Sequence, residues 1–314
     1  MKINLKELAK FENIAIATHT RPDGDAVGSS VGLYYGLKQL GNEPDLLCDM
    51  EIPKKMRFLY GMDKFKTVAK PHYDVVIFSD CADVSRVGNL GLDLRKTKVV
   101  CIDHHETSNK NCDISLIVPS SASTCELVLE ILEENDIAIP FEIADVLYTG
   151  LMTDTGNFAH TNVKEDTFLH ASRLVKYGAN PNLLSRRIFK LMEGDKYKLL
   201  ANILTNLKLF DDGKVAFFYV SKQLLSDLNL SASATEGLID NALSIENVQI
   251  AIAVLQADEK TFKVSFRSIE GIDVNKVAEN FGGGGHKQAA GCTLCGFYED
   301  VVDKLVRQSS LYTV

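Results

Sequence analysis

The sequence contains no apolar run that approaches the roughly 20 residues needed to cross a bilayer. Its amino terminus is polar and has no long apolar segment of the signal-peptide type. Tight binding to a long nucleic acid requires many basic contacts, and no run of lysines and arginines in the sequence offers them. These absences predict a cytoplasmic protein that does not enter a membrane and has no track for long nucleic acids.

Cysteines are few and irregularly spaced. The chain has seven, and this odd number argues against a disulfide framework and for a reducing cytosol. Cys292 and Cys295 form a CxxC pair, but no second pair stands at the spacing of a zinc site. We therefore interpret both as ordinary thiols rather than as a zinc or redox site.

The length of 314 residues favours about two domains, and an apolar content of 46% is ample for globular cores. The net charge is −8, and both parts of the chain are acidic. Residues 1–190 carry 22 basic and 26 acidic side chains, and residues 191–314 carry 12 and 16. Ligands with a few phosphates remain compatible with this charge, because bound metal ions would offset carboxylates at a site.

Residues 14–78 alternate strand-like and helical patterns, which is typical of a doubly wound α/β fold with a mostly parallel sheet. The helix expected from about Ala26 to Leu40 has glycines at four-residue intervals, and this spacing predicts that one face packs very closely on the sheet. Ser123 and Glu126 form a capping box at the start of another helix. Further helices are expected at 141–152, 164–177 and 182–191.

The pattern changes to strands and hairpins in the last third of the chain. Strands are expected at 215–220, 248–255 and 261–268, followed by a helix at 273–280. The sequence thus predicts an N-terminal domain over residues 1–191, a helical connector over 192–208, and a smaller α/β domain over 209–314.

Polar side chains follow several apolar runs at the point where each run ends. The organising stretch is Asp103-His104-His105, which follows the strand-like run 99–102. Open α/β sheets place their binding crevices at such strand ends. Four runs end in this way, and the residues that follow them are His19, Asp23 and Asp25; Asp80; Asp103, His104 and His105; and Asp154. Histidines and carboxylates that arrive by separate routes suggest a site for divalent metal ions.

Each of these residues alone has a simpler interpretation. Asp23-Gly24-Asp25 could be a turn before a helix, Asp80 could cap a turn, and His104 and His105 could be a satisfied core pair. Taken together, four buried carboxylates without cations would cost several kcal/mol for each uncompensated charge. Metal ions would resolve that conflict. Carboxylates with imidazole suit manganese or another octahedral divalent ion.

A second candidate site lies near the carboxyl end of the chain. The run Gly282–Gly285 followed by His286 could be a flexible hinge, or it could let backbone N–H groups approach phosphate oxygens. Arg267, at the end of its strand, could grip a phosphate through two hydrogen bonds. Three other histidines, namely His72, His160 and His170, are interpreted as surface or structural residues.

The ordered motifs resemble the DHH phosphoesterase family with its DHH-associated C-terminal domain, and the resemblance covers nearly the whole chain. The first four motifs are His19-Thr20-Arg21-Pro22-Asp23-Gly24-Asp25, Asp80, Asp103-His104-His105 and Thr153-Asp154-Thr155-Gly156. The C-terminal signature runs from Val264-Ser265-Phe266-Arg267-Ser268 to Gly282-Gly283-Gly284-Gly285-His286 and on to Gly291.

This resemblance implies two Mn²⁺ ions, with Mg²⁺ or Co²⁺ as alternatives. The implied ligands are His19 and Asp23 for one ion, Asp25, His104 and Asp154 for the other, and Asp80 for both. Asp103 would orient an imidazole, and His105 would face the scissile phosphate as an oxyanion donor or acid. The implied substrate-binding residues, which would act across an interdomain cleft, are Arg267, Gly283, Gly284, Gly285 and His286.

Within the family, the length and two-domain layout look like the branch that hydrolyses very short RNA (nanoRNA) and 3′-phosphoadenosine-5′-phosphate (pAp). The expected ligands are therefore short single-stranded RNA and adenosine bisphosphate-type nucleotides. Alternatives are a phosphodiesterase for pApA or cyclic di-AMP, a pyrophosphatase, and a non-catalytic nucleotide sensor. The stretch Asn157–His160 departs from relatives, so base preference cannot be transferred, and His160 could contact substrate. The sequence is compatible with a homodimer.

Overall fold

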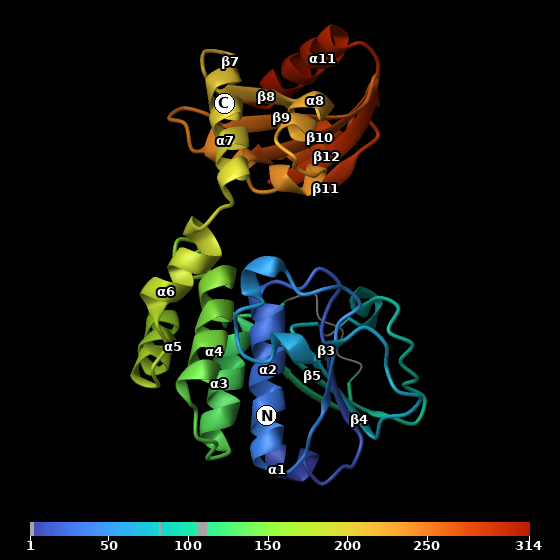
Figure 1. The fold of residues 1–314 in the computed structure, drawn as a ribbon, viewed down its shortest axis with the longest axis vertical. Helices are drawn as coiled ribbons and strands as arrows, with labels where there is room; N and C mark the ends of the chain where they lie inside the picture. The colour runs from blue at the N-terminus through green and yellow to red at the C-terminus, as the bar shows by residue number, and fades with distance from the viewer. Residues whose placement is uncertain (1–2, 82, 106–111) are drawn as a thin grey trace. The chain divides into compact units, whose positions relative to one another are not determined.

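The computed structural model describes residues 3–81, 83–105 and 112–314. The chain divides into two compact units, Met1–Leu191 and Met192–Val314, and Figure 1 shows the elements of each. Within the described ranges, no helix is long and apolar enough to cross a membrane.

The first unit is built on a six-stranded parallel sheet with the order β3-β2-β1-β4-β5-β6. The strands are β1 Ile14–Ala17, β2 Asp45–Leu47, β3 Phe65–Lys66, β4 Val75–Ser79, β5 Lys98–Asp103 and β6 Ile114–Ile117. Strand β1, from early in the chain, pairs with β2 on one side and β4 on the other, which is the doubly wound arrangement predicted from the alternating pattern. Because β1, β4 and β5 are neighbours and parallel, their carboxyl ends lie at the same edge of the sheet.

Helices complete this unit. They are α1 Leu5–Leu8, α2 Gly24–Gln39, α3 Thr124–Glu134, α4 Phe141–Asp154, α5 Glu165–Lys176 and α6 Pro181–Ser185, with a π-helical turn at Arg186–Lys190 and short 3₁₀ turns at Lys54–Met56, Met62–Lys64 and Val84–Val87. Figure 1 shows α2 beside α3 and α4. The helix expected over 182–191 is therefore divided into α6 and the π-helical turn, and ends at Leu191 in extended conformation.

The glycine stripe of α2 has a different neighbour from the one that the sequence predicts. A Cβ atom at Gly28 would lie 2.8 Å from Sγ of Cys125 on α3 and 2.9 Å from the carbonyl oxygen of Val146 on α4. At Gly32 it would lie 2.7 Å from a methyl carbon of Val128 on α3. These glycines allow close packing against α3 and α4 rather than against the sheet, so this detail of the prediction is wrong. The reason is that α3 and α4 both pack against the glycine face of α2, which sequence spacing does not reveal.

The capping box at α3 is formed in part. Oγ of Ser123 accepts a hydrogen bond from the backbone N–H of Glu126 at 3.3 Å, as expected. The Glu126 carboxylate instead accepts from the N–H of Ala122 at 2.8 Å and from the hydroxyl of Ser121. Glu126 therefore orders the residues before the helix, beyond its cap.

The second unit contains a mixed sheet with the order β11-β12-β10-β9-β8-β7, in which only β8 and β9 pair in parallel. The strands are β7 Lys208–Phe210, β8 Val215–Val220, β9 Ile250–Asp258, β10 Thr261–Ser268, β11 Gly284–His286 and β12 Ala289–Cys295. The helices are α7 Gly194–Asn206, α8 Lys222–Asp227, α9 Ile239–Leu243, α10 Val274–Glu279 and α11 Tyr298–Ser310, with a 3₁₀ turn at Ala232–Thr235. The core on one face includes α10 and α11, and the core on the other includes α7, α8 and α9.

Helix α7 corresponds to the connector expected from the sequence. Leu199 and Ile203 on this helix are fully or almost fully buried and belong to the core of the second unit, with Phe218 of β8. The helix therefore packs as part of that unit rather than only linking the two.

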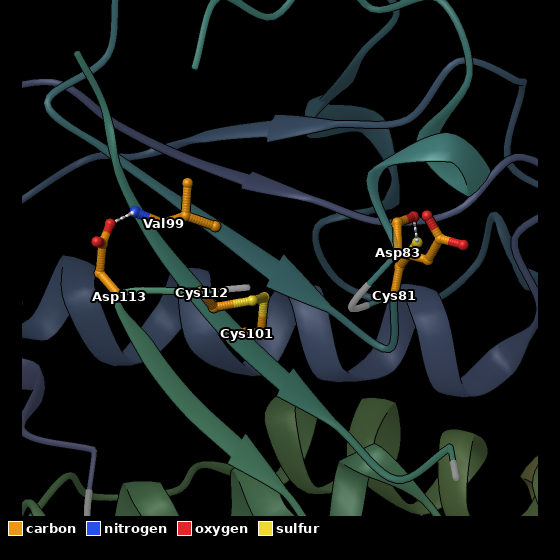
Figure 2. The surroundings of a disulfide bond; sticks show 6 residues. All are labelled: Cys81, Asp83, Val99, Cys101, Cys112 and Asp113. Carbon is orange, nitrogen blue, oxygen red and sulfur yellow. Dashed lines mark hydrogen bonds between the residues drawn. A yellow bond between two sulfur atoms is a disulfide. The ribbon is translucent and has the colours of Figure 1, made fainter. Parts of the chain in front are cut away.

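Cys101 and Cys112 form a disulfide, which the cysteine pattern did not predict (Figure 2). Cys101 lies in β5, and Cys112 precedes β6, which pairs with β5. Next to this bridge, the N–H of Val99 donates to the Asp113 carboxylate at 2.7 Å. The expectation of reduced thiols is wrong for this pair, because the spacing of the two residues could not show that the β5–β6 pairing brings them together. Cys292 and Cys295 are free thiols.

Candidate metal centre

Three adjacent strands of the first unit end in polar residues at one edge of the sheet. His19 follows β1 after one threonine, Asp80 follows β4 directly, and Asp103 is the last residue of β5. His19 and Asp80 are 8% and 1% exposed, and Nε2 of His19 lies 3.5 Å from Oδ2 of Asp80. Asp80 has φ +56°, a left-handed conformation that turns the chain immediately after the strand.

The N-terminus of α2 supplies two more carboxylates. Asp23 is the N-cap and accepts hydrogen bonds from the N–H groups of Asp25 and Ala26. Asp25, in the first turn, is fully buried, and its two oxygens accept from the N–H groups of Thr124 at 2.6 Å and Cys125 at 2.8 Å. Asp25 therefore lies against the N-termini of α2 and α3, where unpaired N–H groups stabilise negative charge.

His104 connects the carboxylates that come from different elements. Its Nε2 lies 3.3 Å from Oδ2 of Asp154, at the end of α4, 3.6 Å from Oδ1 of Asp80 and 3.8 Å from Oδ2 of Asp25. The other ring nitrogen, Nδ1, lies 3.3 Å from the carbonyl oxygen of Ser121. Among the described residues, Nε2 is buried without a hydrogen-bond partner, so it points into the space between the three carboxylates.

The ligand atoms form three overlapping groups, within each of which all atoms lie within 4.8 Å of one another. The groups are His19, Asp23 and Asp80; Asp25, His104 and Asp154; and Asp80, His104 and His105. Thus the structure brings together all six residues that the sequence analysis assigns as metal ligands. Asp80 belongs to two of the groups and links the first to the neighbourhood of His104.

Burial and mutual repulsion disfavour the charged carboxylates. Burial raises the pKa of Asp80 well above its usual value, and the charges of Asp25 and Asp23 raise it further. Burial also raises the pKa of Asp25, although His104 opposes this shift. The pKa of Asp154 is raised to about 8, first by burial and then by Asp25 and Asp23.

These residues fit a divalent metal. The unpartnered Nε2 of His104 faces carboxylates that have no strong positive charge beside them. Oxygen and imidazole ligands suit Mn²⁺ or Mg²⁺ better than an ion that prefers thiolates. In the described part of the chain, every ion pair of Asp25, Asp80 and Asp154 is with a histidine. A bound cation would give Nε2 of His104 a partner and would neutralise the charge of the carboxylates.

Asp103 holds the loop that carries the two histidines. One oxygen, Oδ1, accepts from the N–H of His104 at 2.7 Å and from the N–H of His105 at 3.1 Å, and lies 2.7 Å from Nδ1 of His105. This hydrogen bond raises the pKa of His105 despite its partial burial. The ring of His105 is thereby fixed through Nδ1, which leaves Nε2 for another partner.

The predicted substrate-binding residues lie in the second unit. Arg267 on β10 and His286 on β11 are both register partners of Ala289 on β12, so the two side chains lie on the same face of the sheet. The glycine run is not a hinge, because Gly284 and Gly285 belong to the edge strand β11. A Cβ at Gly283 or Gly285 would approach the carbonyl oxygen of Gly291 or Ala289 within 2.4 Å, so these glycines permit close strand pairing. Their contact with phosphate stays a prediction.

Some residues at the centre were missed by the sequence analysis. The hydroxyl of Thr124 donates to Oδ1 of Asp80 at 2.9 Å, in addition to the backbone contact with Asp25. Nδ2 of Asn162 donates to the carbonyl oxygen of Asp154 at 3.2 Å. The capping box indicates that Thr124 lies at the start of a helix. It does not indicate which carboxylates the N-terminus of that helix contacts.

The remaining histidines differ in their surroundings. His170 is buried beside Glu126 and Glu130, and His72 is exposed beside Asp74, as expected for structural and surface residues. His160 is exposed, and its Nδ1 lies 3.4 Å from the carbonyl oxygen of Asp154. His160 therefore lies beside the metal centre, and its contact with substrate stays a prediction.

Comparison with known proteins gives the same picture from independent sequences. Residues 13–151 match the DHH family, N-terminal domain, and residues 212–310 match the DHHA1 domain. The bifunctional oligoribonuclease and PAP phosphatase NrnA of Thermus thermophilus is 32% identical over 92% of this chain and 88% of its own. The protein of the same name from Bacillus subtilis is 26% identical over 92% of each.

A solved structure has the same architecture. The crystal structure of an exopolyphosphatase-related protein from Bacteroides fragilis is 25% identical, covers 98% of this chain and 96% of its own, and superposes with a TM-score of 0.86. With both domain matches in order, a full-length relative above 30% identity and the clustered His/Asp ligands, this chain belongs to the DHH/DHHA1 family of metal-dependent phosphoesterases.

Proposed function

We propose that this phosphoesterase hydrolyses short oligoribonucleotides and the 3′-phosphate of pAp with the help of two Mn²⁺ ions. The observation that carries the proposal is the position of Asp80, which shares one ligand group with His19 and Asp23 and another with His104 and His105. A carboxylate placed between two such groups suits a pair of ions. The names of the NrnA relatives support the substrate class.

In this proposal, His19 and Asp23 hold one ion, and Asp25, His104 and Asp154 hold the other, with Asp80 shared. When bound, two divalent ions supply a deprotonated water as nucleophile and neutralise charge on the phosphate. The N–H groups of Thr124 and Cys125 and the hydroxyl of Thr124 fix the orientation of Asp25 and Asp80.

His105 would act on the phosphate. Asp103 accepts from its Nδ1 side, which favours the tautomer or charged form with a proton on Nδ1 and fixes the ring plane. Nε2 can then donate a hydrogen bond to a phosphate oxygen, or a proton to the leaving oxygen when the ring is charged. Asp103 is a positioning residue here, because it acts through His105.

The second unit would bind the nucleotide. Arg267 offers a planar pair of donors for phosphate, and His286 lies on the same sheet face one strand beyond Ala289. Both parts of the chain are acidic, so longer RNA gains few further phosphate contacts. This favours substrates of about two to four nucleotides, an estimate from the small number of available phosphate-binding cations.

The experiment is an initial-rate comparison with Mn²⁺ across pAp, pApA, RNAs of increasing length, pyrophosphate and cyclic di-AMP. We expect pAp and the shortest RNAs to be turned over fastest. Asp80→Asn should abolish turnover, whereas Asp74→Asn, at the opposite end of β4, should retain it. Fastest turnover of pyrophosphate, cyclic di-AMP or a long RNA, or nucleotide binding without Mn²⁺-dependent turnover, would replace this proposal by the corresponding alternative.

A further inference from the structure

The second unit contains a cavity of about 250 Å³ on the face of its sheet that also carries α7 and α9. Its base is apolar and is formed by Phe218 of β8 and by Ala253 and Leu255 of β9. Ile239, at the start of α9, adds an apolar side wall. Strands β8, β9 and β10, which all contribute residues to its lining, are neighbours in the sheet (Figure 1).

One side of this cavity is cationic. Lys263, Ser265 and Arg267 alternate along β10 with buried residues of the opposite face, so all three face the cavity and line it. At about 3.4 Å per residue, the Cα atoms of Lys263 and Arg267 lie about 14 Å apart. Among the described residues, Arg267 forms one ion pair, between its Nε and Oδ1 of exposed Asp240 at 3.9 Å. Such a surface pair is weak enough to yield to a phosphate.

The segment before α9 adds an acidic side chain to the lining of the cavity. Glu236, in the segment before α9, lines it and is exposed, with a carboxylate that can only accept hydrogen bonds. The cavity is thus apolar at its base, cationic along β10 and acidic at Glu236. A nucleotide has the matching parts, because its base is a flat apolar ring with amino donors at the edge and its phosphate is anionic.

We propose that this cavity binds one nucleobase of the substrate, while Lys263 and Arg267 hold the adjoining phosphates and Glu236 accepts a hydrogen bond from an exocyclic amino group. The inference rests on the proposed function and adds Lys263, Glu236 and the apolar base to its site. The volume is below the roughly 300–1,000 Å³ of pockets for drug-sized ligands, which suits one base rather than a dinucleotide. Uracil has an oxygen where cytosine has its amino group, so the carboxylate disfavours uracil.

The test measures binding of AMP and of ribose 5-phosphate, which lacks the base, to the full-length protein in EDTA by calorimetry. We expect AMP to bind roughly five- to a hundredfold more tightly, the range for one stacked or buried base. Lys263→Ala should weaken both ligands by about tenfold, as expected for a lost charge-assisted contact. The matched control is Lys304→Ala on α11, whose core residues pack on the opposite face of the sheet; it should change neither affinity.

Two further variants test the base itself. Ala253→Phe fills the apolar base of the cavity and should reduce the affinity for AMP to that for ribose 5-phosphate, without affecting the latter. Glu236→Ala should remove the preference for AMP over UMP. Because Glu236 is exposed, this second variant remains informative even if the larger side chain at Ala253 prevents folding.

The outcomes separate this inference from the proposed function. Equal affinities of the wild-type protein for AMP and ribose 5-phosphate, or an unchanged preference for AMP over UMP in Glu236→Ala, would overturn the base pocket. Turnover with Mn²⁺ is measured separately. If turnover of pAp and short RNA is absent while the binding pattern is present, the proposed function fails and the pocket stands; the reverse result refutes only the pocket.

Discussion

Replacing Asp80 by asparagine should make the metal-free protein more stable and the manganese-bound protein less stable. Asparagine has the same shape and can still accept the hydrogen bond from Thr124, but it removes a buried charge surrounded by Asp25 and Asp23. The pKa of Asp80 is raised in the folded state, so its stabilising protonation is complete at low pH and is lost as the pH rises through the folded pKa. The gain from the substitution should therefore grow with pH.

The size of the effect follows from two opposing free energies. An unpaired buried charge costs several kcal/mol, and partial relief by nearby N–H donors leaves about 2–3 kcal/mol to be gained at pH 8. For a unit of this size, 1 kcal/mol corresponds to a change of about 2–4 °C in Tm. We expect the metal-free variant to unfold about 4–12 °C above the wild type. Conversely, Mn²⁺ at a thousandfold above its Kd should stabilise the wild type by about 4.1 kcal/mol, which exceeds that advantage, and the variant by much less.

The assay is thermal unfolding followed by calorimetry at pH 6 and pH 8, with EDTA or with Mn²⁺. The stability order of the two proteins should reverse when Mn²⁺ is added, and the advantage of the metal-free variant should be smaller at pH 6. The matched control Asp74→Asn alters the amino end of β4 and should not change the response to Mn²⁺. A metal-free Asp80→Asn protein that is less stable than the wild type at pH 8 would show that Asp80 is a structural partner of the histidines rather than part of a repulsive cluster.

Three other perturbations have defined expected results. Arg267→Ala or His286→Ala should raise KM, measured by steady-state kinetics, about ten- to a hundredfold through the loss of a phosphate contact. Either variant should keep the Tm increase with Mn²⁺ in thermal unfolding. Loss of that Tm increase would place the residue at the metal centre. Although burial raises the pKa of Asp45, hydrogen bonds from two lysines and a tyrosine lower it overall, so Asp45→Asn should reduce stability by about 1–3 kcal/mol at pH 7. That difference should shrink below about pH 4, because the stability from a lowered pKa is lost as the pH falls through the folded pKa, and a difference constant down to pH 2 would contradict it. Reduction of Cys101–Cys112, or Cys112→Ser, should lower stability by about 3 kcal/mol for a loop of this length, and an unchanged denaturant midpoint would show that the bridge is not formed in solution.

The sequence predicts that the site residues converge, because several of them occur at the same kind of local position, the carboxyl end of a strand. His19 and Asp80 follow short apolar strands and Asp103 ends one, and parallel neighbouring strands end at one edge of their sheet. Knowing that these segments are strands is therefore enough to expect their polar ends near one another. Asp154 needs more, because it lies at the end of a helix, α4, whose direction is set by packing against α2.

Contacts between distant segments are what sequence reasoning missed. Thr124 and Cys125 donate to Asp25 across about a hundred positions in the chain, and the glycine stripe of α2 meets α3 and α4 instead of the sheet. The disulfide Cys101–Cys112 depends in the same way on the pairing of β5 with β6. Periodicity identifies which face of an element is apolar, but the partner of that face depends on how all the elements pack.

The choice of donors around the carboxylates explains why the centre is suited to ions. Thr124 and Cys125 contribute neutral N–H and O–H groups to Asp25 and Asp80, and these orient the carboxylates without cancelling their charge. A lysine or arginine in the same position would satisfy the charge permanently and would compete with a metal ion. Fixed neutral donors hold the ligands in place while the negative charge remains, so the stability that the metal-free fold gives up is recovered only when divalent ions bind.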